Sequence, residues 1–201
     1  SSTASTTINA TVGSVISIST GTTVAIALTP TAGGVVSSAS DTVTVSTNNS
    51  TGYALTLANS DATRNLVSGG NTILPHAGTQ ASPTALAANT WGYRVVSVGG
   101  FGATAYSAES NNGSSSSTWA GVPATGSANT LKTTATTASG DTTTVWYGVK
   151  ADSTKPGGTY SDTVTYTATT NYINRIYGET DSVKNAWRLR VRTRVTGFFN
   201  C

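Results

Sequence analysis

Residues 142–171 read TTTVWYGVKADSTKPGGTYSDTVTYTATTN, and apolar and hydroxyl side chains alternate along both halves of this stretch. Successive side chains of a β-strand point to opposite faces of the sheet, so the alternation predicts two strands, each with one apolar and one hydroxyl-rich face. Between them, DSTKPGG at 152–158 favours a reversal of the chain, because proline fixes φ and glycine tolerates positive φ. The stretch therefore predicts a β-hairpin.

The same alternation recurs in the residues that precede this stretch. Residues 41–58 predict a second hairpin around the turn NNSTG, and residues 90–96 and 130–137 predict further strands. Residues 8–28 contain two more apolar runs on either side of Thr20-Gly21. About eight to nine short strands with turn signals between them are typical of a Greek-key, Ig-like β-sandwich. We therefore expect an all-β fold with long irregular loops at 59–89 and 99–117.

The composition agrees with an all-β chain outside the cytosol. Serine and threonine supply about a third of the positions and charged residues only 9%, and threonine and valine favour strands because their branched Cβ fits a pleated sheet. The single cysteine, Cys201, has no intrachain partner, so neither a disulfide nor a zinc cluster is expected. The chain starts at Ser1 without a methionine, which would fit a removed signal peptide, and no run of 18 apolar residues predicts a membrane span. We expect an extracellular or cell-surface location and no cofactor.

The charges divide the chain into unequal parts. Residues 1–170 carry five basic and six acidic side chains, whereas residues 171–201 carry six basic and two acidic ones. We therefore expect a flexible end at 1–7, a β-sandwich domain at 8–171, and a basic connector plus strand at 172–201. A nearly neutral domain without a basic groove argues against nucleic-acid binding.

The sequence AWRLRVRTRV at 186–195 predicts one further strand, because its apolar and basic residues alternate strictly. This strand could be the last one of its own sandwich, a strand donated to a neighbouring subunit, or a basic arm for an anionic polymer or membrane surface. It could also be an unrelated tail. Its apolar face holds Trp187, Leu189, Val191 and Val195, and its basic face holds Arg188, Arg190, Arg192 and Arg194.

Catalytic and metal-binding residues are sparse. His76 is the only histidine, stands far in sequence from any acid, and is expected to be an exposed loop residue. Asp141, Asp152 and Asp162 lie in turn contexts and lack the spacing of a calcium loop. A cross-link of Lys132 or Lys150 to Asn171 is a weak option. We therefore expect no enzyme and no metal site.

The aromatic residues leave two interpretations open. Tyr93 and Tyr147 fall on apolar strand faces and are expected in the core, whereas Trp119 and Trp146 are candidates for stacking against a glycan. Four asparagines begin N-x-Ser/Thr triplets that a glycosylating host would modify: Asn9, Asn48, Asn49 and Asn112.

Four ordered segments carry a resemblance to a known module: VTVSTNNSTGYALTL (43–57), NTWGYRV (89–95), STWAGVPATGSANTLKTT (117–134) and TVWYGVKADSTKPGGTYSDTVTYTATTN (144–171). Together they resemble the threonine-rich β-sandwich module of predicted surface proteins of candidate-phyla bacteria such as Saccharibacteria, over roughly residues 10–171. The resemblance implies an exported, non-enzymatic surface or appendage protein and supplies no catalytic residue. Residues 172–201 depart from it.

These features together favour a structural role. We expect an extracellular subunit of a surface appendage or filament, which forms a homopolymer when a strand from residues 8–28 or 187–195 completes the sheet of a neighbouring copy. The alternative is an adhesin module that binds surface glycans through exposed aromatic residues and the loops 59–89 and 99–118.

Overall fold

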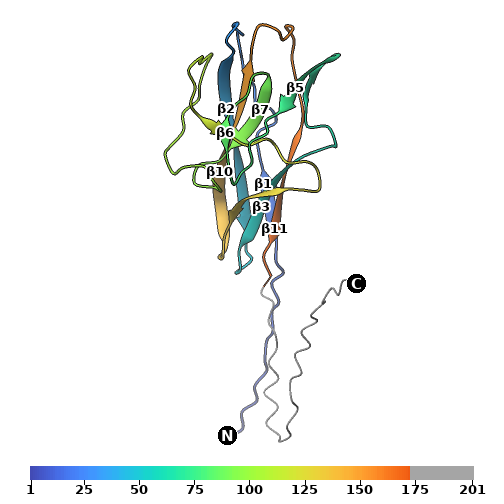
Figure 1. Cartoon of the computed structure of the whole chain (residues 1–201). Coiled ribbons are helices and arrows are strands. Elements are labelled where there is room, and N and C mark those ends of the chain that lie inside the picture. The colour runs from blue at the N-terminus through green and yellow to red at the C-terminus, as the bar shows by residue number, and fades with distance from the viewer. Residues whose placement is uncertain (173–201) are drawn as a thin grey trace, which may run out of the picture.

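The structure is a computed structural model that describes residues 1–172, and this part of the chain is all-β without helices (Figure 1). Its eleven strands form three sheets, with the orders β1-β2-β10-β7-β5-β4, β11-β3-β9 and β6-β8. The strands are β1 (Ile16–Ser19), β2 (Val35–Thr47), β3 (Tyr53–Asn59), β4 (Leu66–Ser68), β5 (Asn71–Pro75), β6 (Thr84–Ala85), β7 (Thr90–Arg94), β8 (Thr118–Trp119), β9 (Asn129–Thr133), β10 (Ala138–Ala151) and β11 (Val164–Thr170).

The antiparallel pair of β2 and β10 forms the centre of the largest sheet. Its register runs from Val35 opposite Ala151 to Thr47 opposite Ala138, with one irregularity close to Ala138. Strand β1 pairs with the last residues of β2, and β7 pairs with the second half of β10. Together, β2 and β10 provide the long surface on which the other elements are placed.

The two predicted hairpins are wrong, although their strands exist. Strands β10 and β11 belong to different sheets, since β10 pairs with β2 and β7 whereas β11 pairs with β3. Strands β2 and β3, on either side of the turn NNSTG, are separated in the same way. Alternation shows only that one face of a strand is buried. It is the same for two strands that face each other across a core as for two strands paired in a hairpin, so it cannot distinguish the two arrangements.

Side chains from both larger sheets meet in one hydrophobic core. Alternate residues of β2 and β10 point into it, and so do the alternate residues of β3. Tyr93 and Tyr147, which the sequence placed in the core, are both buried. The fully enclosed members are Val43, Val45, Tyr53, Leu55, Leu57, Tyr93, Ala120, Val122 and Val145.

The opposite face of the largest sheet is also covered along part of its length. Residues 109–112 of the segment 99–118 pair with the edge of the first half of β2, where the Ser38 amide donates to the Glu109 carbonyl at 2.9 Å and Val36 forms a bridge with Asn112. The Tyr106 hydroxyl of the same segment lies 2.8 Å from Ser38 Oγ. A second cluster forms beneath it from Val36, Leu86 and Trp119, with Tyr106 and Trp146 packed against them. The edge pairing and this cluster together explain why four consecutive residues of β2, 35–38, are buried.

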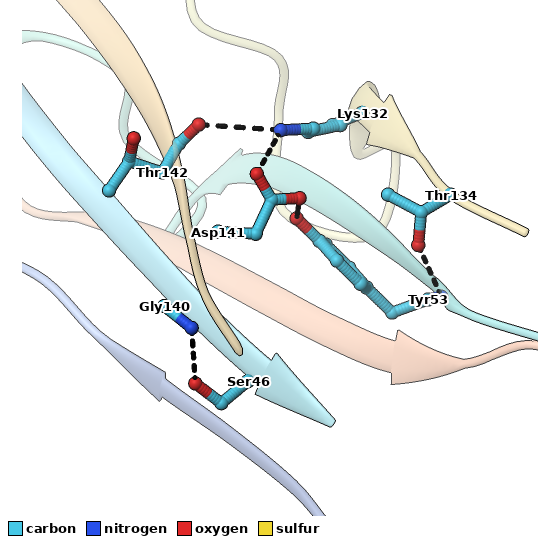
Figure 2. A network of polar contacts seen from close by, with 7 residues as sticks. All are labelled: Ser46, Tyr53, Lys132, Thr134, Gly140, Asp141 and Thr142. Atoms are coloured by element: carbon cyan, nitrogen blue, oxygen red, sulfur yellow. Dashed lines mark hydrogen bonds and ion pairs between the residues drawn. The ribbon is translucent and has the colours of Figure 1, made fainter. Parts of the chain in front are cut away.

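One polar network joins the two larger sheets (Figure 2). Lys132 on β9 forms an ion pair with Asp141 on β10, with 2.6 Å between Nζ and Oδ1, and the Tyr53 hydroxyl on β3 donates to Asp141 Oδ2 at 2.7 Å. Partial burial acts to raise the pKa of Asp141, but the hydrogen bonds from Lys132 and Tyr53 and the Lys132 charge outweigh it, so the pKa is lowered. The network therefore holds a carboxylate between the sheets.

Gly148 in β10 provides a test of the packing on the covered face. A Cβ at this position would lie 2.6 Å from the ring of Trp119, which is fully buried and unable to move aside. We predict that Gly148→Ala lowers the free energy of unfolding by about 1–3 kcal/mol, the usual cost of overpacking, measured by urea denaturation.

Gly157→Ala is the matched control, because nothing lies within 4 Å of the Cβ it would add. Its expected effect is within about 0.5 kcal/mol, as for most surface substitutions. An equal loss in both variants would contradict the packing of Trp119 against β10.

Candidate functional site

Residues 1–15, the N-terminal arm, extend away from the sheets at the end of the molecule where β1 begins (Figure 1). All fifteen residues are exposed, and Ile8 and Val12 expose 85% of their surface. Single exposed apolar residues are ordinary on a protein surface. Two such residues on an extended segment without a strand partner in the described part of the chain are unusual.

The arm continues the alternating pattern of β1. Its even-numbered positions 8, 10 and 12 are apolar and lie in phase with Ile16, which packs against the core, whereas positions 7, 9 and 11 are polar. Residues 1–29 contain no charged side chain. The arm therefore has the sequence of a half-buried strand, although it pairs with no strand of the described chain.

Side chains of the turn after β2 fix the direction in which the arm leaves the molecule. The Val15 amide donates to Asn48 Oδ1 at 2.8 Å, the Asn48 amide group donates to the Gly13 carbonyl at 2.9 Å, and the Thr47 hydroxyl donates to the Val15 carbonyl at 2.7 Å. Residues 13–15 are thus held in place, whereas residues 1–12 project beyond this attachment.

The same turn also holds the chain after β11. Asn49 Nδ2 donates to the Asn171 carbonyl at 2.7 Å, and Asn171 Nδ2 donates to the Thr134 carbonyl at the same distance. Gly52 has a φ of 77°, and a Cβ there would lie 2.3 Å from the Thr134 oxygen, so this position requires glycine. The chain therefore enters and leaves the sheets at one end of the molecule. The predicted strand of residues 187–195 lies outside the described residues.

The tryptophans proposed for glycan stacking lie in the second cluster. Trp119 is fully buried, edge-on to Tyr106 with 5.5 Å between ring centroids, so its ring presents no free face to a sugar. Trp146 is only partly buried and meets Tyr106 edge-on at 5.0 Å. Of the two, only Trp146 has surface available for a ligand.

A buried arginine in this cluster was not among the sequence predictions. The Arg94 guanidinium carbon lies 4.2 Å from the centroid of the Tyr106 ring, and the residue is 8% exposed. Burial lowers the pKa of Arg94, although the charges of Tyr106 and Glu109 act in the opposite direction. Stacking on aromatic faces is a common environment for a guanidinium with little access to water. The sequence feature that could have indicated it is an arginine in strand β7 that directly follows Tyr93 and therefore points to the opposite face of the sheet.

His76 is buried and not, as expected, an exposed loop residue. Its Nε2 lies 2.9 Å from the Thr84 hydroxyl. Burial lowers the pKa of His76, and a hydrogen bond with the backbone of Thr84 acts to raise it. A glycine allows another part of the same chain to come close to His76, because a Cβ on Gly121 would lie 2.0 Å from the His76 carbonyl oxygen. The position of a lone histidine between proline and alanine gave no sign of this enclosure.

A hollow of about 680 Å³ opens beside His76. Its lining combines small loop residues with the polar side chains of Arg64, Gln80 and Asn129. Gln80 and Asn129 are oriented by the buried Tyr93 hydroxyl, which lies 2.7 Å from each of them. The hollow therefore presents a cation and two oriented amides, and its lining contains no phenylalanine, tyrosine or tryptophan.

The candidate metal ligands lie apart. Asp152 accepts hydrogen bonds from Thr154 and Asn89, Asp162 accepts one from Asn59, and Asp141 pairs with Lys132. Within residues 1–172 no three histidine, cysteine or acidic side chains gather as a metal site would require. Lys132 and Asn171 likewise each have other polar partners.

Residues 1–172 include no helix with the length and apolar character needed to cross a membrane. No protein-family model, curated protein or solved structure matches this chain.

The buried histidine predicts a pH-dependent stability. Because the pKa of His76 is lower in the folded than in the unfolded protein, the unfolded state binds more protons, and stability falls as the pH decreases below the ordinary value of 6.5. We expect the free energy of unfolding of the natural protein to decline from pH 7 to pH 5, and that of His76→Gln to change less over this range.

Urea denaturation at pH 5, 6 and 7 measures this difference. The chain has no other histidine, so a slope that persists unchanged in His76→Gln would contradict a buried, neutral His76.

Proposed function

We propose that this protein is a structural subunit of an extracellular appendage or filament, in which copies assemble by β-strand pairing. The observation that carries the proposal is the N-terminal arm, an alternating, uncharged segment that is extended, exposed and without a strand partner in the described chain. Adding such a segment to a sheet of another molecule provides main-chain hydrogen bonds together with the burial of alternate side chains.

The arrangement of the arm supports an open polymer. The arm leaves one end of the body, where Asn48 and Thr47 fix its direction, so the surface that gives a strand differs from the surface that receives one. A heterologous contact of this kind repeats from copy to copy and produces a filament when its rotation does not close a ring. The strand of residues 187–195 is the other candidate donor.

The location and the finer fold belong to the same proposal. A serine- and threonine-rich composition with few charges supports an extracellular surface protein. Two sheets that share one core support a Greek-key β-sandwich as the architecture of the body. Such a body would serve as the rigid unit from which the arm projects.

Substitutions on the two faces of the arm test the proposal. The double variant Ile8→Asp/Val12→Asp places carboxylates on the apolar face, and burial of each apolar side chain contributes about 1.5–3 kcal/mol. We expect association to weaken by about 100-fold or more, measured by sedimentation and by electron microscopy at several protein concentrations.

The matched control is Thr7→Asp/Thr11→Asp, which adds the same charge to the polar face of the same segment. This variant should still polymerise, and both variants should keep the natural melting temperature because the arm is exposed. Filaments that persist in Ile8→Asp/Val12→Asp but disappear when residues 172–201 are deleted would assign the donor role to the C-terminal strand. The absence of filaments of the natural protein at every concentration would refute the proposal.

A second candidate function is carbohydrate binding by an adhesin, and the polar hollow beside His76 favours it. Arg64 and the oriented amides of Gln80 and Asn129 provide donors and acceptors for sugar hydroxyls within the loop region 59–89 and its neighbours. A glycan array tests it: saturable binding that Arg64→Ala removes and that Trp146→Ala leaves in place would support a site in the hollow. An array without saturable binding would exclude an adhesin role for the sugars presented.

A further inference from the structure

Residues 22–28, the acceptor segment, form a second strand-like stretch that has no backbone partner within residues 1–172. Val24, Ile26 and Leu28 are half-buried and pack against the main core, whereas Ala25 and Ala27 are exposed. This alternation is that of a strand. The segment nevertheless belongs to no sheet, and its backbone makes no hydrogen bond to the backbone of residues 1–172.

Polar contacts hold the acceptor segment at both ends. The Gly21 amide donates to Asp41 Oδ1 at 3.0 Å before it, and the Thr29 amide donates to Asn111 Oδ1 at 2.7 Å behind it. The apolar side chains of the segment pack against the core and so determine which of its faces points inward. The peptide groups between these attachments have no backbone partner in the described chain.

The acceptor segment also lacks the features with which proteins block strand addition. Exposed edge strands usually carry a lysine, another charged residue, a proline or a bulge that prevents pairing with a second molecule. Residues 22–28 contain no charged residue and no proline, and Pro30 comes only after the segment has ended. An unprotected edge of this kind is typical of a surface that receives a strand.

The arm of the same molecule is directed away from this segment. β1 begins beside Thr47, at the end of β2 where the arm is attached, and the chain then runs along β2 to Thr31, which pairs with Asp152 near the start of β2. The acceptor segment thus lies toward the opposite end of the body from the projecting arm (Figure 1). A second copy displaced along the long axis of the molecule would bring its arm toward this segment.

The two segments match in pattern and charge. Both are uncharged and of similar length, residues 7–12 against 22–28, and both alternate between apolar and small or polar side chains. In a paired strand the apolar face of Ile8, Ala10 and Val12 would continue the face formed by Val24, Ile26 and Leu28, which are still partly exposed. The added strand would cover these residues, and little desolvation of charge would oppose it.

We propose that residues 22–28 are the acceptor for residues 7–12 of a second copy of this chain. This inference rests on the proposed function and adds the partner surface to it: each copy gives one arm and receives one arm, at opposite ends of its body. The contact is heterologous and therefore repeats along a line of copies.

Disulfide trapping tests the acceptor. In a Cys201→Ser background, Thr11→Cys is combined with Ala25→Cys or with Ala27→Cys, which are exposed positions on the polar faces of the two segments. Paired strands bring such positions to Cβ distances that a disulfide bridges. We expect oxidation to produce a ladder of multimers on a non-reducing gel with one or both pairs, and reduction to return monomers.

The matched control combines Thr11→Cys with Thr167→Cys, an exposed position on β11, and should remain monomeric. Multimers linked through position 167 but not through 25 or 27, in a sample in which electron microscopy shows filaments, would overturn the acceptor while leaving the filament proposal in place. A disulfide within one molecule would also overturn it, because the arm would then lie on its own body. A sample without filaments or multimers would refute both proposals.

Discussion

The pairing of β2 with β10 is the interaction on which the described structure depends. It is the longest ladder in this part of the chain and has strands on both sides, β1 along β2 and β7 along β10. One face of the pair supplies the main core, and the other face supports the cluster of Trp119, Tyr106 and Arg94. Because both faces of the pair are buried, the same two strands bury apolar side chains on each side of the sheet. In this way a chain with few leucines and no methionine obtains a core.

The strands could be predicted from the sequence, but their partners could not. Alternation located β3, β7, β9 and β11 and assigned Tyr93 and Tyr147 to the core, because a period of two depends only on which face is buried. The reversals around Gly52 and Pro156 looked like hairpin turns, yet each carries the chain from one sheet to the other. The difference between a hairpin and such a crossing is a matter of contacts between distant segments, which local residue patterns do not contain.

The candidate site was predicted in part for a similar reason. The apolar run beginning at Ile8 was visible in the sequence, but its lack of a partner is a property of the folded chain. His76 and Trp119 appeared suited to the surface because their sequence neighbours are small or polar. Both are buried because Gly121 and Gly148 allow other parts of the chain to approach closely, and a glycine in a strand reveals only that something approaches, not what does.

The turn at residues 48–52 has a consequence for how this body can be built into larger proteins. Asn48 holds the chain just before β1, and Asn49 holds it just after β11, so the two connections of the body are neighbours in space. A domain with adjacent connections can be spliced into a loop of a host protein without forcing the host apart, and it tolerates circular permutation. The fold is therefore suited to serve as a modular insert, and short linkers would suffice on both sides.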